Sequence, residues 1–141
     1  MSGRWLAGLA ALALLSVAGA PAAVRGTQAG IYTAEQAEQG ARIYAVQCAM
    51  CHGARLEGTV EVPELVGKFM ANWADRPLGD LSDYIARAMP QMAPGTLAPE
   101  DNARVVAFIL RANGAPAGNR ALPSEPAALR RLTFDPAKAG S

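Results

Sequence analysis

The sequence has few histidine, cysteine and aromatic residues, and charges of the two signs nearly balance. One histidine and two cysteines are fewer than the four ligands of a structural zinc site, which makes zinc binding a weak alternative. Thirteen basic residues against twelve acidic ones give no basic excess, which argues against nucleic-acid binding. Aromatic residues form 6% of the chain, so its side chains alone would build a lean core. No convincing strand pattern is present, and no internal repeat.

The scarce reactive residues lie together, in the run Cys48-Ala49-Met50-Cys51-His52. Cys-x-x-Cys-His is the attachment signature of c-type haem, in which each thiol forms a thioether and the histidine ligates the iron. A redox-active dithiol is an alternative, but that motif is typical of an alternating strand and helix pattern. A disulfide between Cys48 and Cys51 would close a very small loop and stabilise little. Haem attachment is therefore the favoured interpretation.

Residues 1–23 have the pattern of a signal peptide. Arg4 supplies a positive n-region, an apolar run covers residues 6–17, and small residues near Ala20 offer cleavage sites. The apolar run is shorter than the roughly twenty residues that a membrane span needs, although an uncleaved anchor is the alternative. Loss of the leader removes Arg4 and no acid, which makes the charge balance even. We expect one exported domain, located in a bacterial periplasm.

Helix start and stop residues predict the elements of the remaining chain. Thr33 and Gln36 form a capping box for a helix over residues 34–47, in which Gly40 permits close approach of another helix. A short helix is expected over 63–70, and a longer one over 78–88 that ends before Pro90. A proline-rich strip with two methionines follows. Pro99 then opens a helix that stops at Asn113-Gly114.

The segments on either side of this region are harder to interpret. Residues 24–32 read as a flexible lead-in, and residues 115–141 as a proline-rich extension. That extension forms either an ordered wrap or a loose tail. Four apolar residues could anchor it to the domain: Leu122, Leu129, Leu132 and Phe134.

The order of haem motif, middle helices, Met-Pro strip and closing helix resembles the class I monohaem cytochromes c. The strings Met89-Pro90, Ala93-Pro94-Gly95-Thr96-Leu97 and Val105-Val106-Ala107-Phe108-Ile109-Leu110 carry the likeness, which covers residues 33–114. They are similar to small periplasmic bacterial cytochromes associated with quinoprotein dehydrogenases or terminal oxidases. The resemblance implies an all-α cytochrome c fold, with about four helices around one covalently bound haem c.

The resemblance also implies roles for residues near the motif. Cys48 and Cys51 would carry the thioethers, and His52 would be the proximal iron ligand. The Pro63 carbonyl would accept a hydrogen bond from the imidazole and fix the ring. Trp73 would lie near a haem propionate, and Gly40 and Tyr44 would lie where the first helix crosses the last, against Phe108.

The chain has no second histidine, so the candidates for the sixth iron position are a methionine thioether, a lysine, or an open position taken by water or a small molecule. Met1 belongs to the leader, Met50 lies inside the attachment motif, and Met70 is equally suited to filling the core. Met89 and Met92 remain, both on the proline-rich strip. Met89 is favoured because the family's axial methionine is followed by proline, and Met92 is the alternative.

These roles predict an electron carrier rather than an enzyme. It would pass one electron from a quinoprotein dehydrogenase or bc1-type donor to an oxidase or another cytochrome, as a monomer or in transient complexes. His/Met ligation raises the reduction potential and leaves no open coordination site. Two alternatives stay open: a haem subunit or gas or redox sensor with a labile sixth ligand, and a dithiol oxidoreductase without haem.

Overall fold

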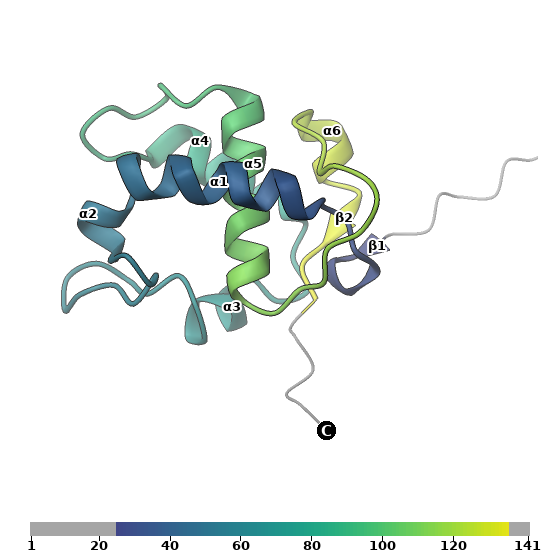
Figure 1. The fold of residues 1–141 in the computed structure, drawn as a ribbon, viewed down its shortest axis with the longest axis horizontal. Coiled ribbons are helices and arrows are strands. Elements are labelled where there is room, and N and C mark those ends of the chain that lie inside the picture. Colours follow the sequence, from purple (N-terminus) through teal and green to yellow (C-terminus); the bar gives the residue numbers. More distant parts are fainter. Residues whose placement is uncertain (1–24, 136–141) are drawn as a thin grey trace, which may run out of the picture.

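The computed structural model describes residues 25–135, which fold into six α-helices, one short 3-10 helix (Thr27–Ala29) and one pair of very short strands (Figure 1). The helices are α1 (Ala34–Gln47), α2 (Ala49–His52), α3 (Lys68–Trp73), α4 (Leu78–Ala88), α5 (Pro99–Ala112) and α6 (Pro126–Leu129). Strands β1 (Arg25–Gly26) and β2 (Leu132–Thr133) pair in parallel. The expected all-α class is thus confirmed. None of the described helices is long and apolar enough to cross a membrane.

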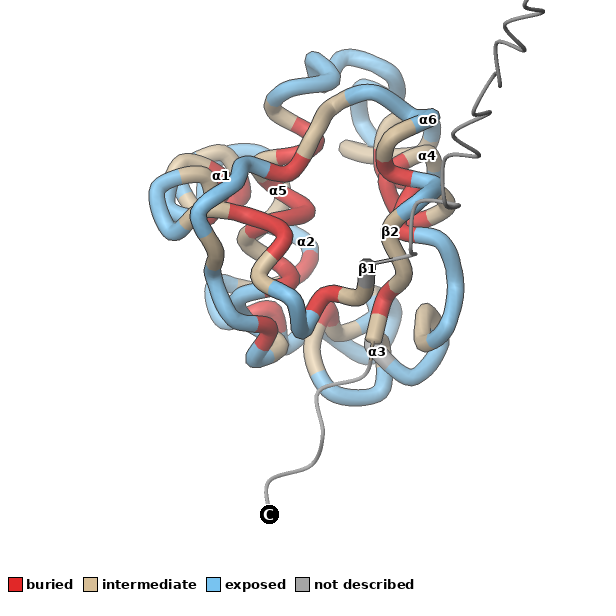
Figure 2. The backbone as a smooth tube through the Cα atoms, turned by 90° about the vertical axis from the view of Figure 1, so that its right-hand side faces the viewer, coloured by how far each residue is buried: buried red, intermediate tan, exposed pale blue. Residues whose placement is uncertain are grey.

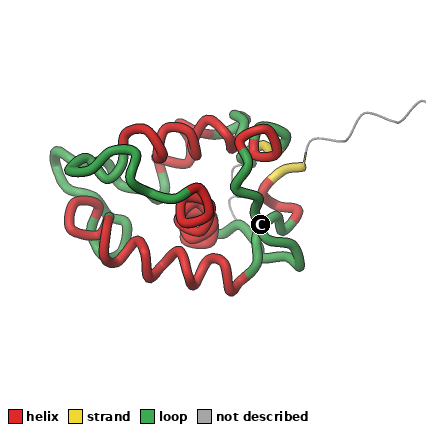
Figure 3. Tube along the Cα trace, turned by 90° about the horizontal axis from the view of Figure 1, so that it is seen from above, coloured by secondary structure: helices red, strands yellow, loops and turns green. Residues whose placement is uncertain are grey.

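Helix α5 forms the centre of the domain and packs against α1 and α4. Figure 3 looks along α5, with α1 on one side of it and α4 on the other. The core is made by the faces that the three helices turn toward each other, and Figure 2 shows these buried segments facing the interior. The buried apolar residues of α4 and α5 include Leu78, Leu81, Ile85, Val105, Val106, Ile109 and Leu110.

Helices α1 and α5 cross in close contact at Gly40. This glycine is buried, and a Cβ atom added to it would overlap the carbonyl oxygen of Arg104. Beside the crossing, the rings of Tyr44 and Phe108 pack with their centroids 5.0 Å apart. The expectation that Gly40 and Tyr44 lie at the crossing, against Phe108, is confirmed.

The three longer helices have the bounds that the sequence predicts, but two local predictions are wrong. The backbone N–H of Gln36 donates to Thr33 Oγ1 at 3.1 Å, which is half of a capping box. The Gln36 side chain instead bonds both backbone groups of Leu122, accepting from its N–H and donating to its carbonyl. The short helix begins at Lys68 rather than Pro63. Residues 63–67 form a loop instead, in which the backbone of Leu65 makes hydrogen bonds to distant residues.

Residues 115–135 form an ordered strap across one side of the domain. Leu122, Leu129 and Phe134 are buried, as is expected of anchor residues, and Leu132 is half-buried. Phe134 also pairs through its backbone with the segment before α4, donating to the Arg76 carbonyl and accepting from the Asp75 N–H. The strap is therefore attached both by apolar side chains and by backbone hydrogen bonds.

The expectation of a flexible lead-in over residues 24–32 is wrong for its described part. Thr27 is buried and exchanges hydrogen bonds with the backbone of Asp135, and Tyr32 is buried with its hydroxyl donating to the Ala115 carbonyl. These hydrogen-bond partners belong to the strap, which is far away along the chain. Sequence patterns that concern neighbouring residues therefore do not predict them. The expected leader, residues 1–23, lies outside the described residues.

Gly40→Ala should destabilise the protein although alanine is the better helix former. We expect a loss of about 1–3 kcal/mol in the free energy of unfolding, because the added methyl group forces α1 and α5 apart. Chemical denaturation measures it. Ala45→Gly, at an exposed position of the same helix, is the matched control and should cost about 1 kcal/mol through propensity alone. A gain of stability in Gly40→Ala would contradict the close crossing.

Leu129→Ala should destabilise the protein by about 2–5 kcal/mol, because it empties a fully buried site under the strap. Thermal and denaturant unfolding measure this loss. Arg131→Ala, two residues further on and exposed, should stay within about 0.5 kcal/mol of the parent protein. Equal stabilities for the two variants would show that the strap does not contribute to the core.

Candidate functional site

A large cavity opens between α1, α2, α4 and α5, and all the residues of the cysteine and histidine motif except Ala49 line it. The cavity and its open mouth together have a volume of about 1200 Å³. The walls are mostly apolar and come from Leu65, Phe69, Leu81, Ile85, Val105 and Ile109, among others. Glu61 is the one carboxylate among the described residues that line it. The cavity suits a large, flat apolar group.

His52 is buried at the end of α2, with 8% of its surface exposed. Its Nδ1 atom lies 3.0 Å from the carbonyl oxygen of Pro63, as the resemblance implies. Because a carbonyl oxygen can only accept, Nδ1 must carry the proton, and Nε2 keeps a free lone pair. The tautomer fixed in this way is the one that can ligate a metal through Nε2.

Short-range backbone bonds place the motif at the turn from α1 into α2. Cys48 ends α1 with its N–H donating to the Tyr44 carbonyl at 2.9 Å, and the His52 N–H donates to the Cys48 carbonyl at 3.0 Å. The Tyr44 hydroxyl donates to the Gly53 carbonyl at 2.6 Å, just after the motif. Burial, with Cys48 and Glu57 nearby, raises the pKa of Tyr44 to about 12, so this hydroxyl remains a donor at neutral pH.

Both cysteines have free thiols and line the cavity. Cys48 is half-buried, and Cys51 is exposed. Burial, together with the neighbouring Cys51, raises the pKa of the Cys48 thiol to about 11. Two thiols on one edge of an apolar cavity, next to a histidine with a free Nε2, form the donor set that covalent haem requires. The residues present therefore fit haem c.

The loop that carries Pro63 is held in place by a residue whose role the sequence did not reveal. Asn113 donates to the Leu65 carbonyl at 2.9 Å and accepts from the Gly67 N–H at 3.2 Å. A further backbone bond joins the Leu65 N–H to the Leu56 carbonyl at 2.8 Å. From the sequence, Asn113 is expected only as a helix stop, because Asn-Gly ends a helix without any tertiary contact.

The two candidate methionines both line the cavity but differ in burial. Met89 is half-buried, packs against the core, and is held at the end of α4 by its N–H, which donates to the Ile85 carbonyl at 2.9 Å. Met92 is 79% exposed and Met50 is 73% exposed. The side chain of Met70 lies outside what the structure describes. Met89 is thus the methionine of this strip that the fold holds most firmly.

Trp73 is not among the described residues that line the cavity. Its ring packs between those of Phe69 and Tyr84, with centroids 6.0 Å away in each case, and the Arg76 guanidinium lies 4.7 Å from its centre. This aromatic cluster joins α3 to α4. Its contacts lend no support to the expected place of Trp73 near a haem propionate.

Comparison with known proteins places this geometry in a family. Residues 35–109 match the family model described as cytochrome c oxidase, cbb3-type, subunit III. Among solved structures, the sulfane dehydrogenase SoxCD from Paracoccus pantotrophus aligns with 26% identity and a TM-score of 0.46. The alignment covers 77% of this chain and 59% of that one. A search of curated proteins found no match.

The family match covers more than half of the chain and includes the motif, the cavity walls and Met89. The two cysteines, the buried histidine and the apolar cavity of this chain are the parts that a c-type cytochrome needs. The chain therefore belongs to this cytochrome c family: it is a small, mostly helical monohaem cytochrome that binds haem c covalently and transfers electrons through the haem iron.

Proposed function

We propose that the protein is a periplasmic electron carrier in which His52 and Met89 are the two axial ligands of the haem iron. It takes one electron from a dehydrogenase or bc1-type donor and passes it to an oxidase or another cytochrome. It acts as a carrier and not as an enzyme. Cys48 and Cys51 supply the thioethers, and Pro63 orients His52.

The observation that carries this proposal is that His52 and Met89 line one apolar cavity, each held by its backbone surroundings. The hydrogen bond to Pro63 leaves Nε2 of His52 available as a ligand. Met89 offers a thioether sulfur from the half-buried end of α4. When bound, haem supplies a one-electron couple, whose potential His/Met ligation raises.

The protein's own contribution is to keep both ligands in place and water away. Leu81, Ile85, Val105 and Ile109 form apolar walls from α4 and α5. Mostly apolar walls, with both axial positions of the iron filled by His52 and Met89, favour outer-sphere electron transfer, because no coordination site is left for a substrate. This environment supports the carrier function over oxygen or peroxide chemistry.

Contacts with redox partners are expected to be small and short-lived, because electron-transfer complexes lie at the low end of interface size. The even charge balance of the exported chain does not favour a strongly charged partner surface. The exposed side chains of Met50 and Met92 lie beside the cavity and are available for apolar contact.

Met89→Ala should abolish the weak far-red absorption band of iron–methionine ligation in the ferric protein. The reason is that the thioether is lost while His52 and the covalent attachment remain. Optical spectra of the oxidised and reduced haem-loaded protein measure this. Met92→Ala is the matched control: its side chain is largely exposed, and the band should persist.

Loss of the band in Met92→Ala but not in Met89→Ala would reverse the ligand assignment. A high-spin ferric spectrum in the unmodified protein would mean an open iron site, and the carrier proposal would then be wrong. Rapid binding of carbon monoxide to the folded, reduced protein would have the same meaning.

Export should remove the leader. We expect the protein recovered from a bacterial periplasm to have a mass that lacks about the first 23 residues and includes one haem, because the small residues near Ala20 suit signal peptidase. Intact-mass spectrometry of periplasmic and membrane fractions measures this. A membrane-bound protein with the full-length mass would instead indicate an uncleaved anchor.

A second candidate function is a haem subunit of an enzyme complex, or a sensor with a labile sixth ligand. The observation in its favour is that the matching family is described as a subunit of an oxidase. Co-purification of the native protein with a larger redox complex, together with carbon monoxide binding, would favour this function over a free carrier.

A further inference from the structure

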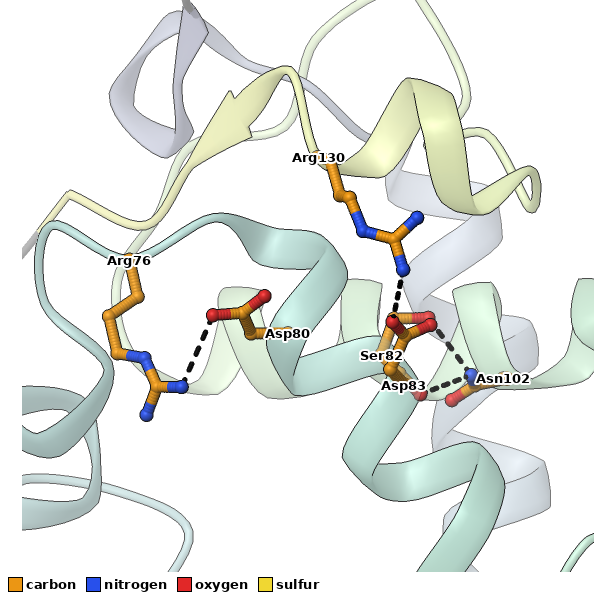
Figure 4. A network of polar contacts seen from close by, with 6 residues as sticks. All are labelled: Arg76, Asp80, Ser82, Asp83, Asn102 and Arg130. Carbon is orange, nitrogen blue, oxygen red and sulfur yellow. Dashed lines mark hydrogen bonds and ion pairs between the residues drawn. The ribbon is translucent and has the colours of Figure 1, made fainter.

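Helices α4 and α5 are joined by a buried polar contact between Asn102 and Ser82 (Figure 4). Asn102, on α5, is 4% exposed, and its Nδ2 donates to the carbonyl oxygen of Ser82 at 2.9 Å and to Ser82 Oγ at 3.0 Å. Ser82, on α4, is also buried. In a domain with few buried polar side chains, such a contact fixes two helices at one point.

The orientation of the Asn102 amide follows from its partner. The Ser82 carbonyl can only accept, so the NH2 group must face α4. This leaves Asn102 Oδ1 buried and without a hydrogen-bond partner among the described residues. An unpaired buried acceptor is unfavourable, and an apolar side chain of similar size would avoid it. Stability alone is therefore a poor explanation for an amide at this position.

The spacing along both helices connects this contact with the cavity. On α4, Ile85 follows Ser82 by three residues, and Met89, the cap residue directly after the helix, follows it by seven; both line the cavity. On α5, Val105 and Ile109 follow Asn102 by the same intervals, and both also line it. Residues at these spacings share one helix face, so each helix presents the polar contact and its part of the cavity wall on the same side.

We propose that Asn102 is a positioning residue for the methionine ligand: by bonding Ser82 it fixes α4 on α5 and so holds Met89 at the cavity wall. The inference rests on the proposed ligation by Met89. Without the contact, α4 can slide or tilt on its apolar neighbours, and Met89 leaves the iron more often. The distal ligand then becomes easier to displace while the fold persists.

The outer face of α4 provides a matched control. Asp83, the residue after Ser82, forms an ion pair of 2.7 Å with Arg130 of the strap. Both side chains of this pair are partly exposed, so it is screened by water and holds α4 only weakly. Figure 4 shows the two contacts from neighbouring residues of α4, one to α5 and one to the strap.

The test is a titration of the haem-loaded ferric protein with imidazole, followed by loss of the far-red methionine band. Imidazole binds the iron only when the methionine has left. The apparent dissociation constant for imidazole therefore falls as the fraction of protein molecules without bound methionine rises. We expect Asn102→Leu to bind imidazole about tenfold more tightly than the parent protein, with a melting temperature close to it. Asp83→Asn should bind imidazole as the parent does.

Ser82→Ala keeps the carbonyl acceptor and loses only the hydroxyl, so it should show a smaller tightening in the same direction. If Asn102→Leu does not fold with haem, Ser82→Ala decides: tighter imidazole binding supports the proposal, and unchanged binding overturns it. Unchanged affinity in a folded Asn102→Leu overturns it as well, whatever its melting temperature. Equal tightening in Asp83→Asn would also overturn it, since any loosening of α4 would then suffice.

Failure of the ligand assignment is visible separately. If the far-red band survives in Met89→Ala, the proposed ligation is wrong whatever the imidazole affinities show. If the band is lost in Met89→Ala and Asn102→Leu binds imidazole like the parent, the ligation stands and only the role of Asn102 fails.

Discussion

The contact of α1 with α5 at Gly40 is the constraint on which the other parts of the cavity depend. At this point the backbone of α1 lies so close to the Arg104 carbonyl of α5 that only the hydrogen atom of a glycine fits between them. The C-terminal end of α1 then delivers Cys48, and the same α5 supplies Val105 and Ile109 to the opposite part of the wall. One small residue thus sets the distance between the attachment motif and the cavity lining.

Two asparagines, Asn102 in α5 and Asn113 at its C-terminal cap, extend this arrangement to the groups around the iron. Near the start of the helix, Asn102 holds α4, which is followed directly by Met89. At the other end, Asn113 holds the loop that follows Pro63, and Pro63 accepts the hydrogen bond of His52. The same helix therefore supports the segments that carry both proposed ligands, each through an amide bonded to a backbone carbonyl.

The sequence predicted what is local, and it failed where the partner lies far along the chain. The bounds of α1, α4 and α5 follow from Thr33, Pro90 and Pro99, each of which acts on adjacent residues. The haem-attachment motif could be recognised because the spacing of its two cysteines and its histidine is what the attachment requires. Met89 as the iron ligand stays a prediction, taken from the family's Met-Pro pattern. Gln36 bonds Leu122 and Thr27 bonds Asp135, contacts that span 86 and 108 residues and that no local pattern encodes. The contacts of Asn102 and Asn113 could not be predicted for the same reason.

The parallel pairing of β1 with β2 brings the two ends of the described chain together, on the side of the molecule away from α2 (Figure 1). A tether attached at either end would reach the molecule from this side and leave the cysteine motif facing outward. Two modules joined to the two ends would emerge next to each other. The geometry thus suits attachment to an electrode or a larger assembly, with the cysteine motif turned toward solution.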